Sequence, residues 1–215
     1  MKDVELRELV EAELEWEPSL NAAHVAVTVH DSVVTLGGHV ETYAEKLAAE
    51  RAVRRVKQVR GVAMDIEVRP PSAKQVDDED IATRAVNSLR WQSNIPGSDI
   101  HVSVNRGWIT LGGDVEWRYQ REAAERAVRY LSGVVGVTNE IAIRSTSQPD
   151  DLKQRIVSAL ARNAAAEAKS VAVDVEGGQV RLSGKVHSWH DRKLIEDAIW
   201  AAPGVTSVKD EIRIG

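Results

Sequence analysis

The sequence predicts an α/β chain of small α+β sandwich modules, because one helix-strand-strand-helix-strand unit is written three times. Its clearest stretch runs over residues 100–115, with copies at 25–40 and 171–186. Apolar residues at every second position are typical of half-buried strands, and the short polar turn between two such runs indicates a hairpin. The register holds without gaps, so that Leu36, Leu111 and Leu182 occupy matching positions.

Each unit is expected to begin with a helix. Leu6, Val10 and Leu14 are spaced by four in the first unit, and in the other two units aspartates precede the apolar run, where they can cap a helix and favour its positive end. A second helix, over about residues 43–56 in the first unit, follows the hairpin. The closing strands are expected at 62–68, 137–143 and 205–214. Gly133 and Gly204 mark the ends of the second helices, a common place for glycine, whereas the first unit has Gln58 there.

These elements define three domains, at residues 3–69, 78–144 and 149–215, which we call modules 1, 2 and 3. Each is expected to form a three-stranded mixed sheet covered by two helices. Polar linkers at 70–75 and 145–148 join them. A unit of this size buries only about 60% of its unfolded surface and is marginally stable alone. Gly38, Gly113 and Gly184 fall on the inward face, where we expect a helix to approach closely.

Composition limits the functions that the chain can have. There is no cysteine, which excludes disulfides and thiolate chemistry, and the net charge of −5 gives no support for nucleic-acid binding. The N-terminus lacks the apolar core of an export signal, and no uncharged run reaches membrane-spanning length. We therefore expect a soluble, cytoplasmic protein, and a periplasmic one only if an export signal precedes this sequence.

The repeated pattern resembles a known family. In module 2 it reads Ile109-Thr110-Leu111-Gly112-Gly113-Asp114-Val115 followed by 133–143, and it recurs at 180–186 with 204–214. This pattern resembles the BON domain, and all three units match it. The resemblance implies a small α/β sandwich and non-enzymatic roles in phospholipid attachment, envelope maintenance and osmotic stress. One relative of the family joins a BON domain to a LysM domain and binds potassium, which implies ion sensing as an alternative.

A search for chemistry finds no catalytic constellation, no metal site and no cofactor site. Ser183-Gly184-Lys185 is similar to the end of a P-loop, but Gln179 replaces the required glycine and Val186 the required hydroxyl residue. His187 and His190 have too few ligands beside them for a metal. No enzyme hypothesis stands.

Aromatic usage is unusual, with six tryptophans and no phenylalanine. We expect Trp16 and Trp91, near the ends of the first helices, to pack against the core, as Trp200 does on a second helix. Trp117 and Trp189 lie instead where a strand leads into the second helix. Module 1 has a capping-box spacing there, Thr42 to Glu45, whereas module 2 places Trp117 at the capping position itself.

Basic residues follow both of these tryptophans. An aromatic ring beside basic side chains suits the interface of an anionic bilayer. The alternative is a hydrophobic staple at the helix start together with ordinary surface charge. Modules 2 and 3 have eight basic against nine acidic residues and ten against ten, whereas module 1 has eight against thirteen, so we expect modules 2 and 3 to bind anionic phospholipid, peripherally at the inner membrane face. The predicted lipid-binding residues are Trp117, Arg118, Tyr119 and Arg121 in module 2, and Trp189, His190, Arg192 and Lys193 in module 3.

The competing hypothesis is a protein-interaction scaffold that works through open sheet faces. Trp108 alternates with Ile109 and is therefore expected on the outer face of its sheet. Because a tryptophan removes a large apolar area from water when it is covered, we expect Trp108 to contact another module, another copy of the chain or a protein partner.

Overall fold

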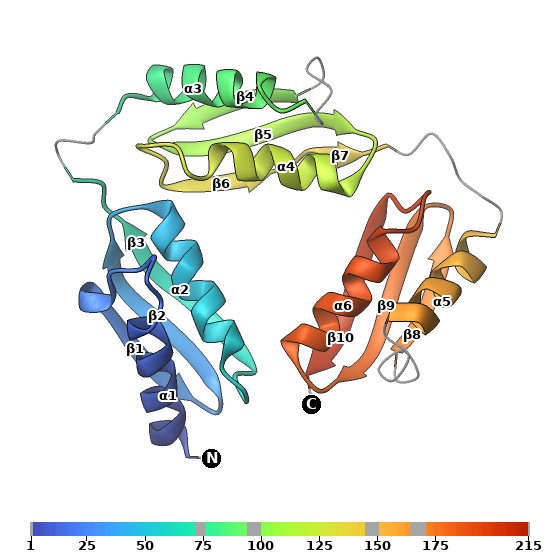
Figure 1. Ribbon diagram of the computed structural model, residues 1–215, viewed down its shortest axis with the longest axis horizontal. Helices are drawn as coiled ribbons and strands as arrows, with labels where there is room; N and C mark the ends of the chain where they lie inside the picture. The colour runs from blue at the N-terminus through green and yellow to red at the C-terminus, as the bar shows by residue number, and fades with distance from the viewer. Residues whose placement is uncertain (1, 72–75, 94–99, 145–150, 164–170, 215) are drawn as a thin grey trace. The chain divides into compact units, whose positions relative to one another are not determined.

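The computed structural model describes residues 2–71, 76–93, 100–144, 151–163 and 171–214. Within these residues the predicted helix-strand-strand-helix-strand order occurs three times (Figure 1). The triplicated α+β fold is therefore confirmed. The linker 145–148 and most of the linker 70–75 lie outside the described residues.

In module 1 the elements are α1 (Asp3–Glu15), the short 3-10 helix η1 (Ala22–His24), β1 (Val25–His30), β2 (Val33–Val40), α2 (Tyr43–Arg55) and β3 (Gly61–Val68). Strand β2 is central: it pairs antiparallel with β1 and parallel with β3. The sheet is thus mixed, as predicted.

Module 2 repeats this arrangement with α3 (Asp78–Arg90), β4 (Ile100–Asn105), β5 (Trp108–Val115) and α4 (Arg118–Val128), and its last strand is divided into β6 (Gly136–Asn139) and β7 (Ala142–Ile143). Both pieces run parallel to the central β5. Between them the Glu140 N–H still donates to the Leu111 carbonyl at 2.8 Å, so the division does not open the sheet.

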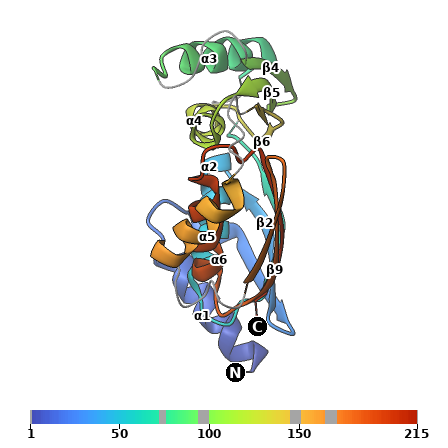
Figure 2. The ribbon, with the colours of Figure 1, turned by 90° about the vertical axis from the view of Figure 1, so that its right-hand side faces the viewer.

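Module 3 consists of α5 (Leu152–Asn163), β8 (Val171–Glu176), β9 (Gln179–Val186), α6 (Trp189–Trp200) and β10 (Ser207–Ile214). Its strand order is again hairpin strand, centre, parallel strand. In Figure 2, α5 and α6 lie on one side of this sheet, and no described helix of the module lies on its other face.

The core of each module lies between its helices and the inward face of its central strand. Leu36, Leu111 and Leu182 are each fully buried there, in equivalent places, as the repeat predicts. Trp200 packs at the edge of the module 3 core, also as expected.

Backbone conformation is the first reason for the repeated glycine of the central strand. Gly38, Gly113 and Gly184 all have positive φ, between 103° and 140°, which side chains rarely adopt. At Gly38 a helix also approaches closely, because an added Cβ would collide with the carbonyl oxygen of His24, the last residue of the 3-10 helix η1.

The hairpin turns accommodate left-handed backbone conformations in two ways. In modules 1 and 2 non-glycine residues take left-handed conformations, among them Ser32 at φ 64° and Arg106 at φ 51°. The first residue of the opening helix holds each turn: Asp3 accepts two turn N–H groups at 3.0 and 3.3 Å, and Asp78 accepts two at 2.7 and 2.8 Å. Module 3 uses Gly177 and Gly178 instead, and glycine takes such conformations without steric cost.

Candidate functional site

The entrances of the second helices differ among the modules. Thr42 and Glu45 form a full capping box at the start of α2, and at α6 the Ser188 hydroxyl accepts from the Asp191 N–H at 3.1 Å. At α4 the side chain of Gln120 accepts from the Trp117 N–H at 3.0 Å. Module 2 therefore keeps one half of the box, while Trp117 cannot supply the hydroxyl of the other half, as the sequence indicates.

The predicted module 2 patch is only partly presented to solvent. Tyr119 is 51% exposed, and Trp117 is half-buried. Arg118 and Arg121 are partly buried, and both already interact with other groups. The aromatic part of this patch is thus more accessible than its charged part.

In module 3 the basic side chains of the predicted patch are paired with carboxylates of the same module. Arg192 bonds to Asp210 on β10 at 2.7 Å and stacks over the Trp189 ring at 5.3 Å. Lys193 bonds to Asp197 one turn further along α6, at 2.9 Å, and His190 is exposed. An anionic ligand at this patch has to compete with two carboxylates that belong to the module itself.

The prediction that Trp16 and Trp91 pack against the core is wrong. They are the C-cap residues of α1 and α3, and they are 84% and 88% exposed. A helix turns by about 100° per residue, so Trp16 lies about 200° around α1 from the buried Leu14. The helical periodicity of the sequence could therefore have predicted that both tryptophan rings are exposed. Module 3 has Arg162 at the matching position.

Three aromatic side chains of module 2 reach solvent at least in part. Trp91 is 88% exposed at the end of α3, Tyr119 is 51% exposed near the start of α4, and Trp117 is half-buried just before α4.

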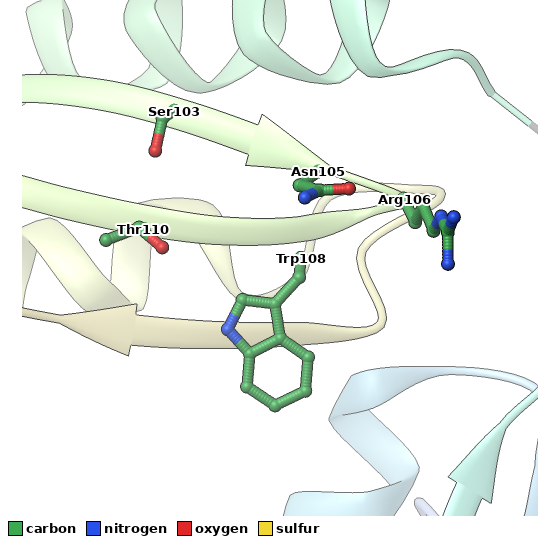
Figure 3. A pocket seen from close by; sticks show the side chains of 5 residues that line it. All are labelled: Ser103, Asn105, Arg106, Trp108 and Thr110. Carbon is green, nitrogen blue, oxygen red and sulfur yellow. The ribbon is translucent and has the colours of Figure 1, made fainter.

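Trp108 lies on the open face of module 2, as its alternation predicts, and is 46% exposed. It lines a hollow together with Ser103, Asn105, Arg106 and Thr110 (Figure 3). Its indole N–H donates to the Thr138 hydroxyl at 2.8 Å, so the ring is held against the neighbouring strand β6 of its own module. Its predicted contact with another module, copy or partner stays a prediction.

Ionisable groups form local pairs rather than a reactive cluster. The Ser19 hydroxyl and the Arg55 guanidinium both donate to Glu17, at 2.6 and 2.9 Å, and hold the pKa of this carboxyl down at about 2. Within the ranges described above, no group of three or more His, Asp or Glu side chains could hold a metal ion. Among the same residues no helix is long and apolar enough to cross a bilayer.

Fold and surface together define a tandem array of small α+β modules with open sheet faces and exposed aromatic residues. The BON domain model matches residues 2–70, 77–145 and 149–215, and the chain belongs to the BON domain family.

Comparison with known proteins finds one related sequence and several distant structures. Osmotically-inducible protein Y of Escherichia coli (strain K12) is 27% identical over 150 residues, which span 64% of this chain and 73% of that protein. A structure of CdsD, a structural protein of the type III secretion system of Chlamydia trachomatis, is 16% identical, with a TM-score of 0.27 over 98% of this chain and 92% of its own. The PrgH periplasmic domain is 10% identical, with a TM-score of 0.23 over 90% and 96%. At these TM-scores neither structure supports a conclusion about this chain.

Proposed function

We propose that the chain is a non-enzymatic protein of the osmotic or envelope stress response, and that it acts by reversible, peripheral binding to anionic phospholipid at the inner membrane face. Its similarity to osmotically-inducible protein Y supports the physiological role. The observation that carries the lipid proposal is the 88% exposure of Trp91, which follows Arg90 at the end of α3.

The physical basis is the preference of tryptophan and tyrosine for the boundary between water and lipid, where an amphipathic ring meets headgroups. An aromatic side chain that is already exposed, such as Trp91, can enter that boundary without any element having to unfold. Module 2 is close to neutral, whereas module 1 has five more acidic than basic residues. An anionic surface therefore repels module 1 and tolerates module 2.

Trp16 and Trp91 make a matched pair for testing this proposal. They occupy the same helix position and are almost equally exposed, but Trp16 stands between Glu15 and Glu17 whereas Trp91 follows Arg90. Trp91→Ser should weaken co-sedimentation with phosphatidylglycerol vesicles about thirtyfold, since burying a large apolar side chain contributes about 2 kcal/mol. Trp16→Ser should change it much less.

The salt dependence separates the charged part of the binding from the aromatic part. Replacing Arg121 with Gln should remove about 1 kcal/mol of binding, and this loss should shrink at high salt. The effect of Trp91→Ser should persist at high salt. Equal losses from the two tryptophan variants, or no pelleting of the parent protein at low salt, would leave the lipid proposal without support.

The second candidate is the interaction scaffold, in which open sheet faces bind protein partners. The observation that favours it is the 46% exposure of Trp108 on the open face of module 2. Trp108→Ser should then change the sedimentation behaviour of the chain, or of its complex with a partner, and leave vesicle binding as it was.

A further inference from the structure

The hollow on the open face of module 2 is built differently from the corresponding surfaces of the other modules. We propose that it is a binding site for a sugar ring, with Trp108 as the stacking platform and Ser103, Asn105, Arg106 and Thr110 as its polar surround. This inference does not depend on phospholipid binding, because Trp91, Trp117 and Tyr119 do not line the hollow.

The first argument is that the platform is preorganised. The indole N–H of Trp108 is bonded to the Thr138 hydroxyl at 2.8 Å. Beneath the ring is Gly136, where an added Cβ would come within 2.5 Å of the indole carbons. The missing side chain of Gly136 gives the ring its place on the sheet, and the hydrogen bond fixes its orientation. Little conformational entropy remains to be lost when a ligand stacks on the ring.

The second argument is the chemistry of the surround. Two hydroxyls, one amide and one guanidinium line the hollow, and among the residues that the structure describes no carboxylate lines it. The C–H face of a pyranose carries weakly positive hydrogens, which favour the negative face of an aromatic ring. Its hydroxyl groups can exchange hydrogen bonds with serine, threonine and asparagine. An acyl chain would leave these polar groups unpaired, which is unfavourable.

The third argument comes from the other two copies. Val33 and Gln179 replace Trp108 in modules 1 and 3, so neither has an aromatic platform. The residues matching Ser103 and Asn105 are Asp174 and Glu176 in module 3, so two carboxylates stand there in place of a hydroxyl and an amide. Among the three copies, module 2 alone therefore has the aromatic platform.

Arg106 gives the site a further preference. It lines the hollow at the hairpin end of the sheet, and its backbone N–H is held by Asp78 at 2.7 Å. A guanidinium binds carboxylates through a planar pair of donors. A sugar that carries a carboxylate should therefore bind more tightly than its neutral counterpart.

Module 1 supplies the variant that tests the site without disturbing the fold. There Val33 packs over Gly61, with its methyl groups 3.5 Å from where a Cβ would lie, in the register that pairs Trp108 with Gly136. Trp108→Val thus installs an arrangement that this fold already uses. Trp91→Ser serves as a second control, because it removes an exposed ring elsewhere in the same module.

The experiment follows the indole N–H signals of the full chain by NMR while cellotetraose or trigalacturonate is added. We expect the Trp108 signal to shift saturably with both sugars and at lower concentration with trigalacturonate. Trp108→Val lacks this indole signal, so its sugar binding is followed by backbone amide shifts, and it should be up to about tenfold weaker, the value of one aromatic stacking contact. Arg106→Gln should remove the advantage of trigalacturonate, and Trp91→Ser should change neither affinity.

Three outcomes would overturn the proposal. The first is no shift of the Trp108 signal up to the solubility limit of either sugar. The second is shifts that persist elsewhere on the chain in the Trp108→Val protein. The third is a Trp108 signal that moves with protein concentration and not with sugar, which would assign the face to a second copy of the chain. Vesicle binding does not enter this experiment, so its result and that of the phospholipid test are separate.

Discussion

Replacing Gln58 with glycine should stabilise module 1. Gln58 ends the α2 region with φ at 74°, whereas the matching Gly133 and Gly204 have φ at 89° and 103°. The left-handed conformation costs an ordinary residue about 1–2 kcal/mol, and glycine returns about 0.5–1 kcal/mol of this through its more flexible unfolded chain. The Gln58 side chain is exposed. The expected net gain in unfolding free energy is about 0.5–1 kcal/mol.

Hydrogen exchange of the full chain, followed by mass spectrometry, can measure this gain module by module. Amides of α2 and β3 should exchange about two- to fivefold more slowly in the Gln58→Gly protein, while those of modules 2 and 3 stay unchanged as internal controls. The reverse change, Gly133→Gln, should destabilise module 2, because a Cβ there would lie 3.0 Å from Ile81 and Val76 atoms. Unchanged or faster exchange of α2 in Gln58→Gly would refute the reasoning.

Three further changes test other parts of the structure. Trp117→Ser should complete the capping box with Gln120 and stabilise module 2 by about 1 kcal/mol in thermal unfolding, while it weakens vesicle binding; a loss of stability would show that the ring is structural. Leu111→Ala should destabilise module 2 by about 2–5 kcal/mol in denaturant titration, and a small cost would mean that its buried site is not equivalent to those of Leu36 and Leu182. Because the folded pKa of Glu17 lies near 2, below the ordinary 4.5, Glu17→Gln should lower the stability of module 1 at neutral pH. That difference should disappear as pH falls from about 4.5 toward 2, and a pH-independent difference would contradict the assigned pKa.

The fold could be predicted from the sequence because the pattern of each element occurs three times, so that each copy supports the other two. Alternation located the hairpins, and the buried leucines follow from their matching positions. The prediction was incomplete where backbone conformation, rather than polarity, determines which residue is present. The positive φ of Gly38 leaves no trace in a pattern of apolar positions, so the alternation predicted only the close approach of a helix.

The candidate site was less predictable, because the partners of its charges are distant in the sequence. Arg192 and Asp210 are 18 residues apart and meet only because β10 runs alongside the centre of its sheet. The exposure of Trp91 was accessible from helical periodicity alone, since the residue is two positions beyond the buried Leu89. The position of the Trp108 ring over Gly136 needed the parallel register of β5 and β6, which no local pattern supplies.

The aspartate-held turns have a consequence for the order in which each module folds. Asp3 and Asp78 lie 28 and 29 residues before the N–H groups they hold, so the turns of modules 1 and 2 gain this support only after a long loop has closed. The two-glycine turn of module 3 needs no such contact, and its hairpin can form on the microsecond timescale of isolated hairpins. Module 3 should therefore nucleate locally, strands first, whereas modules 1 and 2 should wait for their opening helices, which makes a cut after Asp3 or Asp78 costly to the hairpin that follows.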